Sequence, residues 1–520
     1  GAIYTTNETN IDNNTFENNT AIDGGAIYAT DTSTLTVNNT EFDTNIATTN
    51  GGAIYTSGVT NIDTNTFENN EANNGGAIYS ESTATLTVND TTFNTNIATT
   101  NGGAIYTNGE TNIDTNTFAN NEAIDGGAIY STSTLTVNNT EFDTNIATNN
   151  GGAIYASGET NIDTNIFENN EANNGGAIYS ESTATLTVND TTFNTNIATT
   201  NGGAIYTNGE TNIDTNTFAN NEAIDGGAIY STSTLTVNNT EFDTNIATNN
   251  GGAIYASGET NIDNNIFANN EAIDGGAIYA TDTLTVNNTE FNTNIATTNG
   301  GAIYTSGETN IDSNTFANNT AIDGGAIYAT DTLTVNNTEF DTNIATTNGG
   351  AIYASGETNI DNNTFTNNDA IDGGAIYATD TLTVNNTEFD KNTATTNGGA
   401  IYASGETNID TNTFTNNDAI DGGAIYATDT LTVNNTEFDK NTATTNGGAI
   451  YASGETNIDT NTFTNNDAID GGAIYATDTL TVNNTEFDKN TATTNGGAIY
   501  ASGETNIDTN TFTNNDAIDG

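Results

Sequence analysis

Cysteine, methionine, histidine, proline and tryptophan are all missing from this 520-residue chain. Because the chain has no cysteine, it can form no disulfide from which the redox compartment could be inferred. A chain without cysteine or methionine has little to oxidise, which suits an exposed and long-lived surface. Positive charge is scarce too, because three lysine and arginine residues face 67 aspartates and glutamates. The net charge of −64 argues against nucleic acid as a partner, since such binding depends on Lys and Arg, and against docking on anionic lipid.

Long apolar runs are also missing. No segment approaches the roughly 20 apolar residues of a membrane-spanning helix, and no basic and apolar signal segment is present. We therefore expect no membrane insertion by these residues. Because methionine is absent, we expect any export signal or anchor to lie outside them. We find no linker and no proline-rich hinge, and we predict a single repeat domain over residues 1–520.

One motif recurs throughout the chain. Gly-Gly-Ala-Ile-Tyr begins at Gly398, Gly422 and Gly447, so the spacing is 24 and then 25 residues, and the pair repeats as a 49-residue unit. A Phe-x-x-Asn motif follows each Tyr, and the chain has 21 Tyr and 21 Phe. One early unit has 27 residues, with the extra ones in a tolerant loop over Thr30 to Thr34. Such a period predicts a solenoid, here of about 21 coils of 24–27 residues in a two-coil super-repeat.

The residue pattern within a coil favours short strands. In Thr430-Leu431-Thr432-Val433 every second residue is apolar, as a half-buried strand requires. Thr, Asn, Asp and Gly are poor in helix interiors, and the units have too few Leu for a leucine-rich repeat. The sequence therefore predicts an all-β parallel β-helix. The expected inward residues are Ile425, Leu431, Val433, Phe438 and Ala443 in one coil and Ile401, Ile409, Phe414 and Ala419 in the other.

Two motifs per coil carry a family resemblance. Gly-Gly-Ala-Ile, as at Gly422 to Ile425, and Phe-x-x-Asn, as at Phe438 to Asn441, together resemble the repeats of chlamydial polymorphic outer-membrane proteins. Related repeats occur in adhesin-like surface proteins of bacteria and methanogenic archaea. The resemblance covers the whole chain and implies a right-handed β-helix at a cell surface or outside the cell, often serving adhesion. The family's means of anchoring and its non-repeat receptor-binding parts cannot be carried over to these residues.

The corners of the coil are predicted from Gly and Asn. Asn417 and Asn441 should turn the chain, with each amide bonded to those above and below in a ladder. The Gly pair should mark a corner that needs positive φ or a close backbone approach. The predicted structural ladder is Gly422, Gly423, Ile425, Val433, Phe438 and Asn441.

Tyrosine forms a column of its own, represented by Tyr402, Tyr426, Tyr451 and Tyr475. If Ile425 points inward, its neighbour Tyr426 points outward, and the column is a contact stripe that marks an interaction surface. The other reading places the Tyr rings partly in the core or under a loop, with the hydroxyls in water.

Acidic residues alternate with neutral ones from coil to coil. Asp410 should stack against Asn434, and Asp439 should follow Thr415. Like charges are then about 9.6 Å apart instead of 4.8 Å, which matters beside a Debye length of about 8 Å. We hypothesise that the 49-residue unit exists largely to dilute these charge columns. The rule is looser upstream, where Asp43 and Glu68 share a column.

Calcium is the one cofactor that the acids suggest, since carboxylates are its ligands. The candidates are Asp410, Asp421 and Asp439. The Gly-Gly-x-Gly-x-Asp pattern of calcium β-rolls is absent, however, and a solvated acidic surface that gives solubility explains the same residues. Asn-x-Thr sequons such as Asn385-Asn386-Thr387 arise by chance in so Asn/Thr-rich a chain, or else mark a column decorated with sugar.

An enzyme is not expected. Hydrolases need a unique carboxylate cluster, whereas every Asp here recurs. A polysaccharide-active β-helix is a remote alternative, because lyases of that class typically need an Arg or Lys base and the chain has only three such residues. An ice-binding Thr array is another remote alternative, because Glu406 and Asn408 interrupt the Thr ranks. The sequence favours an extracellular structural solenoid that forms a surface shaft, fibre or filament. The alternative is an adhesin passenger whose exposed face binds a host, cell-surface or glycan ligand.

The ends of the sequence suggest self-association. Gly1 is the second Gly of the motif and Gly520 is the first Gly of the next, so joining them regenerates the motif in phase. Neither end departs in composition from the repeats, whereas a finished solenoid needs polar caps over its open strands. We therefore expect these residues to be an interior stretch of a longer filament, formed by one giant chain or by copies associating end to end or laterally.

Overall fold

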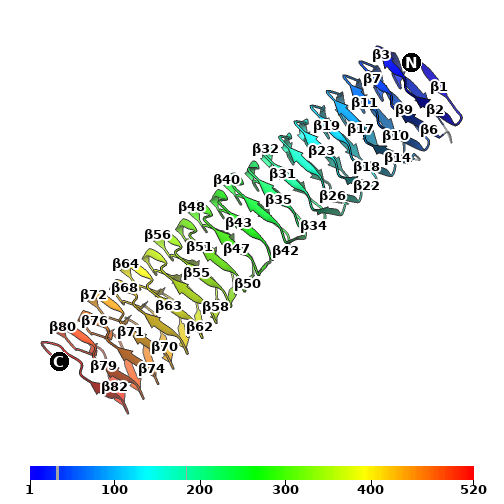
Figure 1. Ribbon diagram of the computed structural model, residues 1–520. Helices are drawn as coiled ribbons and strands as arrows, with labels where there is room; N and C mark the ends of the chain where they lie inside the picture. The colour runs from blue at the N-terminus through cyan, green and yellow to red at the C-terminus, as the bar shows by residue number, and fades with distance from the viewer. Residues whose placement is uncertain (31–33, 83, 183) are drawn as a thin grey trace. The chain divides into compact units, whose positions relative to one another are not determined.

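The computed structural model describes residues 1–30, 34–82, 84–182 and 184–520 (Figure 1). Over these residues the chain contains no helix and 83 short strands, from β1 (Ile3–Thr5) to β83 (Thr511–Thr513). The predicted all-β parallel solenoid is confirmed. The chain divides into two compact units, Gly1–Thr260 and Asn261–Gly520. The predicted loop over Thr30 to Thr34 falls largely on residues 31–33, which lie outside the described residues.

Each complete coil contributes four strands. In the second unit one coil holds β65 (Ile401–Ala403), β66 (Thr407–Asp410), β67 (Thr413–Thr415) and β68 (Asp418–Asp421). The next coil holds β69 (Ile425–Ala427), β70 (Leu431–Asn434), β71 (Glu437–Asp439) and β72 (Thr442–Asn446). In the first unit an equivalent coil holds β5 (Ile27–Ala29), β6 (Leu35–Asn38), β7 (Glu41–Asp43) and β8 (Ile46–Asn50).

Equivalent strands of successive coils pair in parallel, so each unit contains four parallel sheets, named here A to D in the order of the four strands. Like residues face each other across coils, for example Tyr402 with Tyr426 in sheet A and Phe414 with Phe438 in sheet C. In sheet D the register shifts, because β68 has four residues and β72 has five. This bulge accommodates the extra residue of the 25-residue coil.

The core lies between the four sheets and is filled by repeated columns. The strands show the alternation that the sequence predicts, and Ile425, Val433 and Phe438 are fully buried. Phe rings stack almost parallel, with centroids 4.9 Å apart between Phe414 and Phe438. Burying each such side chain stabilises the fold by about 1.5–3 kcal/mol.

The Gly pair forms the corner between sheets D and A, and its two members do different things. Gly422 has φ +64°, which L side chains rarely adopt. A Cβ on Gly423 would lie 2.1 Å from the carbonyl oxygen of Gly448 in the next coil. The predicted requirements, positive φ and close approach, are thus divided between the two residues.

Two further corners of each coil also use the left-handed region. Asn435 and Lys440 have φ of 48° and 57°, and Thr411 and Asn416 in the preceding coil have φ of 60° and 55°. No described segment forms a helix that is long and apolar enough to cross a membrane.

Candidate functional surface

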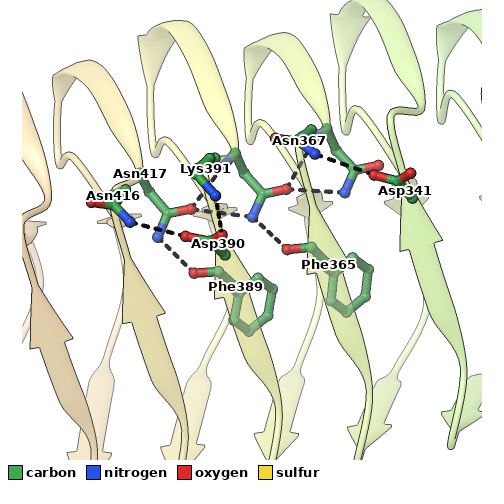
Figure 2. Close-up of polar contacts among 10 residues, drawn as sticks. Asp341, Phe365, Asn367, Phe389, Asp390, Lys391, Asn416 and Asn417 are labelled. Carbon is green, nitrogen blue, oxygen red and sulfur yellow. Dashed lines mark hydrogen bonds and ion pairs between the residues drawn. The ribbon is translucent and has the colours of Figure 1, made fainter.

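The corner between sheets C and D contains a buried asparagine ladder (Figure 2). Asn417 Nδ2 donates to Asn441 Oδ1 at 2.9 Å and to the carbonyl oxygen of Phe389 at 3.0 Å. The Asn417 backbone N–H donates to the same Oδ1 at 3.0 Å. Asn417 and Asn441 are fully buried, so each amide meets its hydrogen-bonding needs through the coils on either side of it.

Outside this ladder, at the same corner, lies a charged group that Figure 2 also shows. Lys391 Nζ lies 2.7 Å from Asp390 Oδ2, and Asn416 Nδ2 donates to Asp390 Oδ1 at 3.0 Å. Burial pushes the pKa of Asp390 upward, but the hydrogen bonds from Lys391 and Asn416 outweigh it and lower the pKa overall. In an upstream coil Thr342 Oγ1 replaces the lysine and donates to Asp341 at 2.9 Å.

The acidic columns have the predicted register. Asp410 pairs with Asn434 in sheet B, and Thr415 pairs with Asp439 in sheet C. In the first unit Asp43 and Glu68 face each other directly, as the looser upstream pattern indicates. Like charges are thus kept two coils apart in the later repeats.

Sequence reasoning missed the hydrogen bonds that these acids accept. Asn435 Nδ2 donates to Asp410 Oδ1 at 2.8 Å. Asn446 donates to Asp421 Oδ1 twice, from Nδ2 at 2.8 Å and from its backbone N–H at 3.0 Å. The neutral residues therefore bind the carboxylates as well as separating them. The sequence feature that could have predicted these hydrogen bonds is an Asn in the following coil that lies in the same column as the acid or next to it.

The three calcium candidates do not converge. Asp410, Asp421 and Asp439 belong to three different columns, and each accepts a hydrogen bond from an Asn side chain of the following coil. Over the described ranges no group of three or more acidic, His or Cys side chains is placed to hold a metal ion. These residues do not fit a calcium site built by one chain.

The tyrosine column lies on the outer face of sheet A, and its representatives in the second unit are half-buried. Tyr402, Tyr426, Tyr451 and Tyr475 stack nearly parallel, with centroids 5.2, 4.6 and 5.2 Å apart. Burial, together with the neighbouring Tyr and Asp residues, raises the pKa of Tyr426 to about 12. The structure combines features of the two interpretations of the sequence. The Tyr side chains point outward, but each ring face is covered by the neighbouring Tyr ring.

Sheet D exposes isoleucine, which the sequence analysis did not anticipate. Ile124 is 37% exposed and Ile420 is 41% exposed, each beside a buried Ala of the same strand. The signal was the alternation in Asp-Ala-Ile-Asp. The exposed isoleucines of this face are Ile22, Ile46, Ile97, Ile124, Ile146, Ile197, Ile224, Ile246, Ile273, Ile295, Ile322, Ile344, Ile371, Ile420 and Ile469.

Surface hollows repeat like the columns. One at the corner between sheets B and C is lined by residues including Asn386, Thr387 and Glu388. Another, two coils upstream, is lined by residues including the equivalent Asn337, Thr338 and Glu339. These are shallow polar depressions of a repeating surface.

Comparison with known families gives one match that recurs along the chain. The family model described as the Chlamydia polymorphic membrane protein (Chlamydia_PMP) repeat matches nineteen segments, which together cover more than half of the chain. The matched residues are 15–30, 39–57, 66–81, 90–108, 117–132, 139–157, 166–181, 190–208, 217–232, 239–257, 288–306, 315–330, 337–355, 364–379, 386–404, 413–428, 435–453, 462–477 and 484–502.

Two further comparisons add little. No curated protein matches the chain. Among solved structures, a mutant of the PL6 family alginate lyase AlyGC is similar at 10% identity over 97% of each chain, with a TM-score of 0.21. A likeness at that score carries no argument about fold or activity.

Proposed function

Because the chain belongs to the family of Chlamydia polymorphic membrane protein repeats, we propose that it is an extracellular structural solenoid that forms a surface shaft, fibre or filament. The family supports a cell-surface location in general terms. The observation that carries the proposal is the repetition of the columns in register, such as Phe414 with Phe438 and Asp410 with Asn434. In such a molecule the number of coils sets the function.

The role we propose is not catalytic. A hydrolase site needs a particular pair of carboxylates in a cleft, whereas the acids here recur along columns. Self-association of shafts, end to end or laterally, belongs to the proposal, and it should strengthen at high salt, where repulsion between acidic surfaces is screened.

Surface labelling tests the proposed location. An antibody raised against the two-coil repeat should bind intact cells of the native source, and an external protease should remove its epitope. The proposal is wrong if the antibody reaches the protein only after the cells are broken. An antibody against a cytosolic protein of the same cells gives the control for integrity.

A second candidate is an adhesin passenger, and the half-exposed tyrosine column favours it. Replacing Tyr402, Tyr426, Tyr451 and Tyr475 by Ala distinguishes the two. Loss of target binding with intact fibres favours the adhesin, and loss of bundling favours the filament. The matched Phe variants keep the stack and remove only the hydroxyls, so they separate ring packing from hydroxyl contacts.

A further inference from the structure

We propose that sheet B of each unit carries a column of N-linked glycans, one on every second coil. The proposed acceptors each begin an Asn-x-Thr sequon and each end a strand of sheet B: Asn38, Asn89, Asn138, Asn189, Asn238, Asn287, Asn336, Asn385, Asn434 and Asn483. This inference rests on the proposed surface location, because sugar is transferred to such acceptors as proteins are exported.

The acceptor side chain points outward and takes no part in the ladders. Asn434 follows the fully buried Val433 on β70 and is half-buried. Its backbone carbonyl accepts from Thr436 Oγ1 at 2.7 Å. Its side-chain amide makes no hydrogen bond among the described residues. Its neighbour Asn435, by contrast, donates to Asp410. A sugar on Asn434 Nδ2 would therefore displace no hydrogen bond of the fold.

The threonine of the sequon sits in a position that tolerates another residue. Thr436 is 2% exposed, and its Oγ1 accepts from the Asn412 backbone N–H at 3.2 Å. The same position of the preceding coil is Asn412 itself, whose Oδ1 accepts from Thr387 N–H at 2.8 Å. Either residue accepts the hydrogen bond from the backbone N–H of the preceding coil at this corner. Only the coils with Thr at this position have the sequon. The chain thus supplies its own matched variant, Thr436→Asn.

The spacing of the column suits a bulky modification. Successive acceptors are two coils apart, about 9.6 Å at the usual strand separation, and Asp410 or Asp459 lies in register between them. Sequons elsewhere do not form such a column. Asn318 and Asn362, for example, have φ of 58° at corners, and their amides donate to Asn residues of the preceding coil.

The chemistry is a group transfer without redox change. The Asn434 amide nitrogen attacks the anomeric carbon of a sugar carried on a lipid phosphate. A C–N bond forms, the anomeric C–O bond to phosphate breaks, and the amide proton leaves to a base of the transferring enzyme. The activated sugar is the co-reactant, and the exporting cell supplies it.

Mass spectrometry of the protein from its native cells tests the proposal. Chymotrypsin, which cleaves at Tyr and Phe, should yield peptides in which Asn434 and its equivalents carry a constant sugar mass, whereas Asn408, which begins no sequon, should carry none. Thr436→Asn should abolish the modification at that site, and Thr436→Ser should retain it. Unmodified Asn434 in protein recovered from the cell surface would overturn the inference and leave the proposed function standing, because antibody labelling of the same cells tests the location separately.

Discussion

Asn417 Nδ2 donates to Asn441 Oδ1 at 2.9 Å across the boundary between two coils, with both residues fully buried. Since Asn441 in turn donates to Asn466 Oδ1 at 3.1 Å, the bonds form a continuous polar line through the interior of the second unit. Each Asn also binds the carbonyl oxygen of a Phe from the preceding coil. The ladder thus ties the corner of every coil to the coils beside it.

Asn441→Ala should destabilise the solenoid locally, in the coils beside the substitution. The change removes an acceptor from Asn417 and a donor from the Phe414 carbonyl, and each buried group left without a partner costs about 1–3 kcal/mol. We expect faster amide hydrogen exchange in β68 and β72, with little change several coils away, because coils contact only their neighbours. Asn408→Ala on the outer face of sheet B is the control. Equal effects of the two variants would refute the structural role of the ladder.

Ser80→Ala should stabilise the first unit. Ser80 Oγ and Ser180 Oγ are buried and have no hydrogen-bond partner among the described residues, whereas Thr56 at the same position of the preceding coil bonds to Thr60 at 2.7 Å. Removing a buried unpaired hydroxyl should raise local stability by about 1 kcal/mol. Slower hydrogen exchange of the Tyr79 and Leu86 backbone amides would show the increase in local stability.

Ser131→Ala is the matched control for that prediction. Its hydroxyl donates to the Ser133 carbonyl at 3.1 Å, so the same substitution should cost about 0.5–1.5 kcal/mol here. If both variants shift stability in the same direction, the explanation by hydrogen-bond pairing fails.

Thr415→Asp should destabilise the second unit most at low salt. Thr415 lies in register between Asp390 and Asp439, so the new carboxylate would place like charges in three successive coils. Exposed charges are screened over about 8 Å at physiological ionic strength and over about 30 Å at 0.01 M. Thermal unfolding of the variant should therefore depend more steeply on salt than that of Thr415→Asn. A salt-independent midpoint would contradict the charge-dilution hypothesis.

Asp125 should make the first unit more stable in acid. Burial raises the pKa of its carboxyl, against the hydrogen bonds that it accepts from Asn150. A folded-state pKa above the unfolded value of about 3.9 means that this contribution is fully present below that pH and is lost as pH rises through the folded pKa. Asp125→Asn should remove this dependence and stabilise the unit at pH 7, because Asn74 already occupies the same column and bonds to Asn50. Identical pH profiles for the two proteins would contradict the assignment.

Much of the fold could be predicted because the same residues recur. A period of two within strands, repeated every 24 or 25 residues, fixes which side chains face inward, and the structure buries Ile425, Leu431 and Phe438 accordingly. The coil-to-coil pairing of Asp410 with Asn434 follows from the same arithmetic. The repeat spacing alone is therefore enough to predict which residues share a column, without knowledge of any interatomic distance.

What could not be predicted depends on distances within the corners. The donation from Asn435 to Asp410 requires the left-handed φ of Asn435, and a spacing rule does not contain it. The bulge of sheet D was hidden in the one-residue difference between coils. The tyrosine rings face outward as adjacent strand positions imply, but their close stacking covers the ring faces, and no residue pattern distinguishes an exposed ring from a stacked one.

The most direct test of the proposed function is the deletion of whole two-coil units. Removing residues 300–495, four units, joins Asn299 to Gly496 and leaves every column in phase. If coil number sets the function, the protein should remain folded and displayed, and electron cryotomography of native cells should show its outer end about 38 Å closer to the surface, at about 4.8 Å per coil. An unchanged height, or loss of the protein from the cell surface, would contradict a shaft made of interchangeable coils.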